Sequence, residues 1–289
     1  MRVLLAVDGS AQSRAAVDLA GSLRWPDGTL IRVVAVVERF SGLLSGMSPY
    51  VEPEIDSEAV ATSLRAVLAD VATTLGSAGR AVETRQLEGR PAGIIVEQAC
   101  DLRADLVIVG SRGFGPLRSM VVGSVSAEVV DRGPCPVLVV RAPSVGSILL
   151  AVDGSATAQR ALEHLAGAHE LEGHPVEVIT AGRLAAEGAM ETVAAAAAER
   201  LLDSGFEARW SIALGDAAHE IIRAADDLGC SLIVMGSRGL TGLDRLRLGS
   251  VARNVLLHAH ASVLVVREPV REILPGPRES RRRPTSVAV

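Results

Sequence analysis

The chain contains no lysine, and all its basic residues other than histidine are arginines. It therefore has neither the phosphate-binding lysine of a Walker loop, nor a kinase-type lysine, nor a lysine that forms a Schiff base. Aromatic residues make up only 2% of a sequence that is 48% hydrophobic, so its cores must be built from Val, Leu, Ile and Ala. That composition suits parallel sheets covered by helices on both faces.

Cysteine is also scarce. Cys100, Cys135 and Cys230 form no C-x-x-C pair, which favours a reduced compartment over a disulfide framework. The first apolar run stops at Asp8 after five residues, so it predicts a strand rather than a signal peptide. No apolar run approaches the length of a bilayer-spanning helix, and a net charge of −5 argues against a general nucleic-acid binder. We therefore expect a cytoplasmic protein without a membrane or nucleic-acid partner.

What the chain does contain is an internal repeat. The segment 3–10 returns 145 residues later as 148–155, and the segment 106–113 returns 126 residues later as 232–239. The two offsets differ by 19, so repeat one holds 19 residues that repeat two lacks. These extra residues must lie between the first and the fourth predicted strand.

The repeat defines the domain plan. A chain of 289 residues is long enough for two domains, which we expect at 1–143 and 144–268. The extra residues of repeat one fall in a Ser-, Gly- and Pro-rich stretch at about 39–57, which predicts a loop. The Pro- and Arg-rich segment 269–289 predicts a disordered tail.

Short apolar runs alternate with longer helical patterns within each repeat, which predicts doubly wound sheets with right-handed crossovers. The strands expected in repeat one are 3–7, 30–37, 82–87, 106–109 and 137–140. Those expected in repeat two are 148–152, 176–180, 206–214, 232–235 and 263–266. The third strand of each repeat alternates polar and apolar residues, which favours an edge position with one exposed face.

A glycine pattern, G-x2-G-x9-G-S, follows the fourth predicted strand of each repeat. It consists of Gly110, Gly113, Gly123 and Ser124 in repeat one, and of Gly236, Gly239, Gly249 and Ser250 in repeat two. Glycines let the backbone approach a ligand, and Gly-Ser at a helix start offers N–H groups, a hydroxyl and the positive end of the helix dipole. Together these features predict a phosphate-binding site that needs no lysine.

An aspartate ends the first predicted strand of each repeat, Asp8 in one and Asp153 in the other. If the first and fourth strands are neighbours, these carboxylates face the glycine loop across the crevice where open α/β sheets bind ligands. A carboxylate there can accept hydrogen bonds from a ribose or from an adenine amino group.

These aspartates, the repeated glycine pattern and the Pro134-Cys135-Pro136 turn before the fifth strand resemble the universal stress protein family, from residue 2 to about 267. The resemblance implies an α/β fold of two tandem doubly wound (Rossmann-like) domains, each with a five-stranded parallel sheet in the order 3-2-1-4-5. It implies ATP as the ligand, with Mg²⁺ at the phosphates, and a role in a stress or dormancy response.

The resemblance also implies roles for individual residues. Asp8 would contact the base and ribose, and Val36 would contact adenine through its backbone. The residues implied to hold ribose and phosphates are Gly110, Gly113, Gly123, Ser124 and Ser126. The matching positions of repeat two are Asp153, Ala181, Gly236, Gly239, Gly249 and Ser250. Ala252 replaces Ser126, and the loss of a hydroxyl donor to a charged group costs roughly 1.5–3 kcal/mol, so we expect weaker phosphate binding in repeat two.

No nucleophile–base pair, metal cluster or carboxylate dyad accompanies the glycine loops in the sequence, so we expect a binding protein rather than an enzyme. One alternative is a slow ATPase or another nucleotide-dependent enzyme, and a second is an interaction protein whose loops are vestigial. For Arg112 and Arg238, phosphate contact and plain solvation are equally open. The resemblance further implies that the two halves meet along their fifth strands as an internal pseudo-dimer, and we also expect a homodimer.

Overall fold

The computed structural model describes residues 1–38, 57–76, 80–113, 122–183, 187–239 and 248–267. The loop predicted at about 39–57 lies almost wholly outside these residues, and the tail predicted at 269–289 lies entirely outside them.

The strands form a single ten-stranded sheet in the order β3-β2-β1-β4-β5-β10-β9-β6-β7-β8. They are β1 (Arg2–Val7), β2 (Leu30–Val37), β3 (Ala81–Glu88), β4 (Leu106–Gly110), β5 (Val137–Val140), β6 (Ser147–Ala151), β7 (Val176–Gly182), β8 (Ala208–Leu214), β9 (Cys230–Gly236) and β10 (Ser262–Val266). Pairing is parallel within each half, and each half has the order 3-2-1-4-5, which confirms the predicted fold class.

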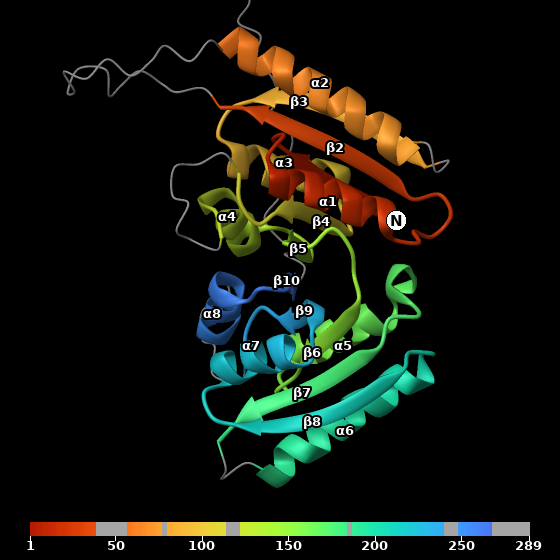
Figure 1. Ribbon diagram of the computed structural model, residues 1–289, viewed down its shortest axis with the longest axis vertical. Coiled ribbons are helices and arrows are strands. Elements are labelled where there is room, and N and C mark those ends of the chain that lie inside the picture. Colours follow the sequence, from red (N-terminus) through yellow and green to blue (C-terminus); the bar gives the residue numbers. More distant parts are fainter. Residues whose placement is uncertain (39–56, 77–79, 114–121, 184–186, 240–247, 268–289) are drawn as a thin grey trace, which may run out of the picture.

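Helices cover both faces of this sheet (Figure 1). They are α1 (Ala11–Ser22), α2 (Ser57–Gly76), α3 (Pro91–Leu102), α4 (Ser124–Arg132), α5 (Ala156–Ala166), α6 (Glu187–Asp203), α7 (Ala217–Asp227) and α8 (Ser250–His258), with a short 3₁₀ turn, η2 (His169–Leu171). One continuous core lies under α1, α2, α5 and α6, and a second lies under α3, α4, α7 and α8. Both cores run through the two repeats without a break.

The strand sequences explain their places in the sheet. All four residues of β5 and all five of β10 are buried, as expected of apolar strands in the middle of a covered sheet. The outermost strands, β3 and β8, are largely exposed or half-buried, which confirms the edge prediction. The strands begin and end within two residues of the predicted boundaries. The strand predicted from residue 206 begins at Ala208, because Phe206 instead inserts into the core ahead of it.

The two halves join along β5 and β10, which pair antiparallel with Leu138 opposite Leu264. These two leucines occupy the same position of the repeat, so the halves are related by an approximate two-fold axis. The expected internal pseudo-dimer is therefore present, and it forms one sheet rather than two (Figure 1).

Two arginines form matching hydrogen bonds across this junction. The Arg141 guanidinium, just after β5, donates to the carbonyls of Leu256 and Ala261 at and beyond the end of α8. Arg267, the matching residue after β10, donates to the Val130 carbonyl near the end of α4. Cations at helix C-termini satisfy carbonyls that have no partner within the helix and oppose the helix dipole.

Within the described residues, one helix passes a test of length and composition for a membrane span: Glu58–Gly76 in α2, with a mean hydropathy of 1.2. A core helix can have the same length and hydropathy, so these two properties alone do not indicate a membrane span. Leu64, Leu68, Val71 and Leu75 of this helix are buried in the core that α2 forms with β2 and β3.

Candidate functional site

The site is built at the carboxyl end of β1. Asp8 follows this strand, and Gly9, with φ of 86°, turns the chain into α1. A backbone in this left-handed region favours glycine. The Asp8 Oδ1 atom accepts the Ser10 N–H at 2.9 Å, which fixes the carboxylate over the turn. Asp153 makes the same 2.9 Å bond with the Ser155 N–H in repeat two.

Gly113 lies against this carboxylate. A Cβ atom at Gly113 would lie 2.3 Å from Asp8 Oδ2, and one at Gly239 would lie 2.6 Å from Asp153 Oδ2. A side chain at either glycine would require the aspartate carboxylate to move. The structure therefore brings the predicted aspartate and the second glycine of the motif together in both repeats, at an exposed point of the backbone.

The first glycine of the motif has a packing role. A Cβ at Gly110 would lie 2.8 Å from the Gln12 carbonyl carbon, and one at Gly236 would lie 2.6 Å from that of Thr157. The first turn of α1 or α5 thus rests directly on the end of the fourth strand of its repeat. These glycines let helix and strand approach closely.

The loop after β4 begins and ends at the same place. The Ser111 carbonyl accepts the Gly123 N–H at 2.7 Å, and Ser237 and Gly249 form the same bond at 2.8 Å. The Ser10 and Ser155 hydroxyls cap their helices and lie 3.3 Å from the carbonyls of Arg112 and Arg238, to which they donate. The sequence analysis missed these two serines, although the repeated Asp-Gly-Ser triplet was a signal.

Ser126 is buried beside the two ends of the loop, Ser111 and Gly123. Its side chain is 3% exposed, and its hydroxyl has two backbone acceptors, the Ser111 and Gly123 carbonyls, both at 3.0 Å. The hydroxyl therefore holds the loop closed. Ala252, the matching residue, is equally buried but has no hydroxyl to do so.

Among the α-helices whose N-caps the structure describes, α3, α4 and α8 have no side-chain cap, and α3 begins at Pro91, which carries no N–H. Side chains of Ser10, Ser155 and Asp216 cap α1, α5 and α7. The N-caps of α4 and α8 are Gly123 and Gly249, with no side-chain cap. The first N–H groups of a helix have no partner within it, so these two starts leave donors for water or an anion. Ser124 and Ser250, the first helical residues, are exposed there.

Val36 and Ala181 lie beside the aspartates. The last pairing of β1 with β2 joins Val7 to Ala35, so Val36 stands at the level of Asp8. Ala181 follows the β6–β7 pairing in the same way. Both are half-buried. The predicted site residues thus lie together at the carboxyl end of the first and fourth strands in each repeat, and Gly110, Gly236 and Ser126 are the ones engaged in packing.

An arginine of each glycine loop lies near an arginine of the junction. The buried Arg141 has its pKa lowered to about 10, first by burial and then by the nearby positive charge of Arg112. Burial also lowers the pKa of Arg267; Asp131 opposes this effect, and Arg238 adds to it. Each loop arginine therefore lies close to an interface arginine, a pairing the sequence analysis missed. The equal spacing of Arg141 and Arg267 from their loops was a signal for it.

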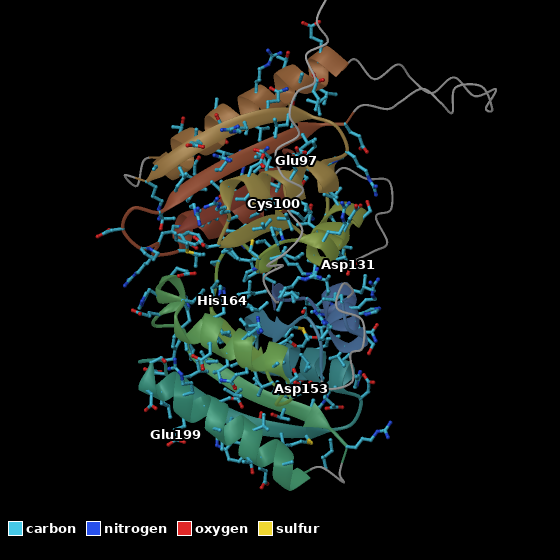
Figure 2. The ribbon with its side chains drawn as sticks, turned by 180° about the vertical axis from the view of Figure 1, so that it is seen from behind. Glu97, Cys100, Asp131, Asp153, His164 and Glu199 are labelled. Carbon is cyan, nitrogen blue, oxygen red and sulfur yellow. The ribbon has the colours of Figure 1, made fainter. Side chains whose placement is uncertain are left out.

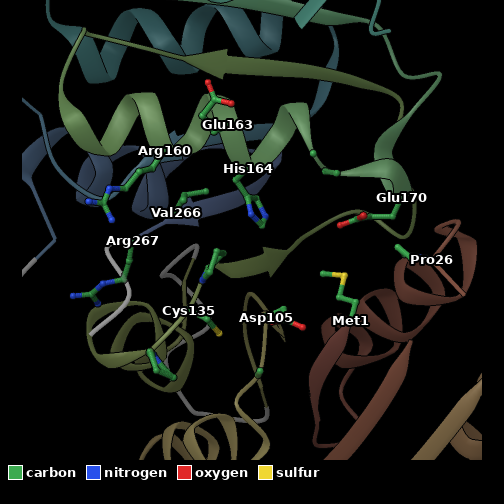
Figure 3. A pocket seen from close by; sticks show the side chains of 15 residues that line it. Met1, Pro26, Asp105, Cys135, Arg160, Glu163, His164, Glu170, Val266 and Arg267 are labelled. Carbon is green, nitrogen blue, oxygen red and sulfur yellow. The ribbon is translucent and has the colours of Figure 1, made fainter. Parts of the chain in front are cut away.

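A separate cavity of about 600 Å³ lies between the repeats, at the amino ends of β1 and β4 (Figure 3). Burial lowers the pKa of His164, raises that of Glu170, and raises that of the Cys135 thiol to about 12. No predicted site residue lines this cavity. It therefore lies apart from the predicted site residues, although Arg267, after β10, lines it.

Among the described residues, no group of three His, Cys, Asp or Glu side chains is placed so that it could hold a metal ion.

The fold and the paired sites define a class of protein: a doubly wound α/β protein in which the strand order reverses between the first and fourth strands of each repeat. The universal stress protein family model matches the chain twice, at residues 1–141 and 145–267. The chain belongs to the universal stress protein family, as a tandem member.

Individual relatives agree with this assignment. A universal stress protein of Synechocystis is 28% identical over 206 residues, which cover 70% of this chain and 71% of the relative. The solved structure of a universal stress protein from Archaeoglobus fulgidus covers 92% of this chain and 98% of its own, at 22% identity and a TM-score of 0.70. That likeness shows the fold. Another solved family member from Archaeoglobus fulgidus, in complex with dAMP, is 26% identical over 42% of this chain, at a TM-score of 0.36.

Proposed function

We propose that the chain is a regulatory protein that binds ATP in both repeats. The observation that carries the proposal is that α4 and α8 begin at a glycine with no side-chain cap, whereas α3, the other described α-helix start without one, begins at Pro91, which has no N–H to offer. Ser or Asp side chains cap α1, α5 and α7, whereas α4 and α8 begin at Gly123 and Gly249 with no side-chain cap. A helix start left open in this way suits a phosphate group. Because the contrast occurs in both repeats, one class of ligand accounts for both sites.

The aspartates support a nucleoside rather than a bare phosphate. Asp8 and Asp153 stand at the carboxyl ends of their strands, beside the backbone of Val36 and Ala181. Their oxygens can accept hydrogen bonds from ribose hydroxyls or an adenine amino group. The backbone of the second strand offers further donors and acceptors to the base.

Arginines supply the positive charge that triphosphates require. Arg112 with Arg141, and Arg238 with Arg267, place two guanidinium groups near each loop. If Mg²⁺ accompanies ATP, it takes most of its ligands from phosphate oxygens and water, as this ion commonly does.

The family and the site both favour regulation over catalysis. The crevice offers carboxylates and backbone amides for binding, and nucleotide occupancy would change how the repeats contact each other or a partner in a stress or dormancy response. A homodimer is part of the proposal. It would use a surface other than β5 and β10, because these strands pair with each other.

A calorimetric series of ATP, ADP, AMP and adenosine tests this function. We expect two ATP molecules per chain and an affinity that falls as phosphates are removed, because the open helix starts act on phosphate. Inorganic triphosphate serves as the matched ligand without a base, and it should bind more weakly than ATP. If adenosine binds as tightly as ATP, the phosphate assignment is wrong; if no nucleotide binds, the proposal fails.

A further inference from the structure

A side chain of repeat one reaches the site of repeat two. Asp131, near the end of α4, lies at the boundary between the two halves (Figure 2). Its Oδ1 atom accepts the Leu248 N–H at 3.4 Å, and its Oδ2 atom lies 3.2 Å from Nη2 of Arg253. Leu248 comes directly before Gly249, the N-cap of α8, and Arg253 belongs to the first turn and a half of that helix.

The repeats are not symmetric at this contact. The residue that matches Asp131 in repeat two is Leu257, and the residue that matches Arg253 in repeat one is Ala127. Neither can form the ion pair. The contact therefore exists at site two alone.

The asymmetry coincides with a second one. At site one, the buried hydroxyl of Ser126 bonds the Ser111 and Gly123 carbonyls and closes the loop from within. At site two Ala252 stands in its place, next to Arg253. Repeat two therefore lacks this internal hydroxyl contact at the start of α8. The Asp131 carboxylate of repeat one contacts that helix start instead.

We propose that Asp131 is a positioning residue of nucleotide site two, supplied across the domain interface by repeat one. This inference rests on the proposed ATP binding. Asp131 holds Leu248 and Arg253 on either side of the open N–H groups of α8, and so orients those groups for phosphate. Site two is therefore coupled to the packing of the two repeats, whereas site one is held by its own Ser126.

The charges around Asp131 are consistent with a positioning role. Its carboxylate is balanced by Arg253 in direct contact and by Arg267 nearby. Arg253 is half exposed, at 50% of its side-chain surface, so the ion pair is only moderately strong. Removing it should weaken ATP binding at site two by about two- to fivefold, the change that a partly exposed ion pair allows.

The test measures each site separately by calorimetry. Site one is closed with Gly123→Asp, which fills its helix start with a carboxylate, and ATP is titrated into that protein with and without Asp131→Ala or Arg253→Ala. Both changes should weaken the remaining site two- to fivefold. Asp131→Asn should lose less than Asp131→Ala, because its side-chain oxygen can still accept the Leu248 N–H.

Two controls separate positioning from general damage. Arg200→Ala removes an ion pair with Glu163 between two helices of repeat two, at a similar exposure of 43%, and should leave site two unchanged. With site two closed by Gly249→Asp, Asp131→Ala should leave site one unchanged. Hydrogen exchange at the amides of 248–253, without nucleotide, should quicken in Asp131→Ala and not in Arg200→Ala.

The outcomes distinguish this inference from the function it rests on. If wild type binds no nucleotide, the proposed function fails and the inference fails with it. If wild type binds but site two is unaffected or strengthened by Asp131→Ala, the inference alone is overturned. It is also overturned if the Gly123→Asp protein binds no ATP while wild type binds one molecule.

Discussion

Replacing the glycine at the start of α4 with aspartate should close site one while stabilising the protein. Gly123 has φ of −77° and ψ of 159°, the extended backbone that a capping residue adopts. An added Cβ would lie 3.4 Å from the Arg112 Cα atom, an ordinary van der Waals contact. In Gly123→Asp the new carboxylate would accept hydrogen bonds from the first N–H groups of α4, where we place the phosphates of ATP.

The two effects have opposite signs. Losing at least two charge-assisted hydrogen bonds, each worth about 1.5–3 kcal/mol, should weaken ATP binding at site one about a hundredfold or more. The free energy of unfolding should rise by about 0.5–1 kcal/mol, because aspartate caps a helix better than glycine and favours the positive end of its dipole. A variant that simply misfolded would lose both binding and stability.

The assay combines ATP calorimetry with urea unfolding. Gly123→Ala is the matched control, since it adds the same Cβ without a carboxylate. It should keep most of the affinity and lose about 0.5 kcal/mol of stability, because alanine caps poorly. If Gly123→Asp binds ATP as wild type does, the phosphates do not lie at the start of α4. If the alanine variant loses as much affinity as the aspartate variant, the effect is steric and the capping argument is wrong.

Three further predictions concern single residues. Gly113→Ala should weaken ATP binding at site one by about tenfold or more in calorimetry, because its Cβ would lie 2.3 Å from Asp8 Oδ2 and must displace that carboxylate. His164→Gln should flatten the pH dependence of the free energy of unfolding, measured with urea, between about pH 7 and 5. Burial lowers the pKa of His164, so wild type is most stable above the pKa of the unfolded chain, about 6.5, and loses stability as the pH falls. Arg141→Met should lower the free energy of unfolding by about 1–3 kcal/mol, because the carbonyl of Leu256 loses a charged donor at the junction.

Each of these predictions has an outcome that contradicts it. Unchanged ATP affinity in Gly113→Ala would show that the Asp8 carboxylate does not contact the ligand. Parallel pH profiles for wild type and His164→Gln would place the titrating group elsewhere. Arg14 forms an exposed ion pair with Asp70, so Arg14→Met is the control for Arg141→Met, and an equal loss in both would refute a special role for the junction.

The sequence was enough to predict most of the fold because both repeats carry the same signals. Apolar runs marked the strands within a few residues, and the alternating third strand marked the edge. Phe206 was misplaced because an apolar residue just before a strand has the same pattern as one inside it. That the halves meet along β5 and β10 followed from the family resemblance and not from any periodicity, and the antiparallel direction of the pairing was not predicted.

The same duplication predicted which residues lie together at the candidate site, but it did not predict the separate roles of those residues. The pattern placed Gly113 and Asp8 together correctly, yet it could not separate Gly110, which packs against α1, from glycines exposed to a ligand. Ser126 could not be assigned a loop-closing role, because burial depends on tertiary packing. The contact of Asp131 with Arg253 joins residues 122 positions apart and breaks the repeat symmetry, so no repeat-based argument could find it.

We propose that both repeats bind ATP with its phosphates at the open starts of α4 and α8. The most direct test of this proposal is the number of ATP molecules bound per chain, counted by equilibrium dialysis in wild type, in Gly123→Asp, in Gly249→Asp and in the double variant. We expect two, one, one and none. Two molecules bound to the double variant, or none bound to wild type, would contradict it.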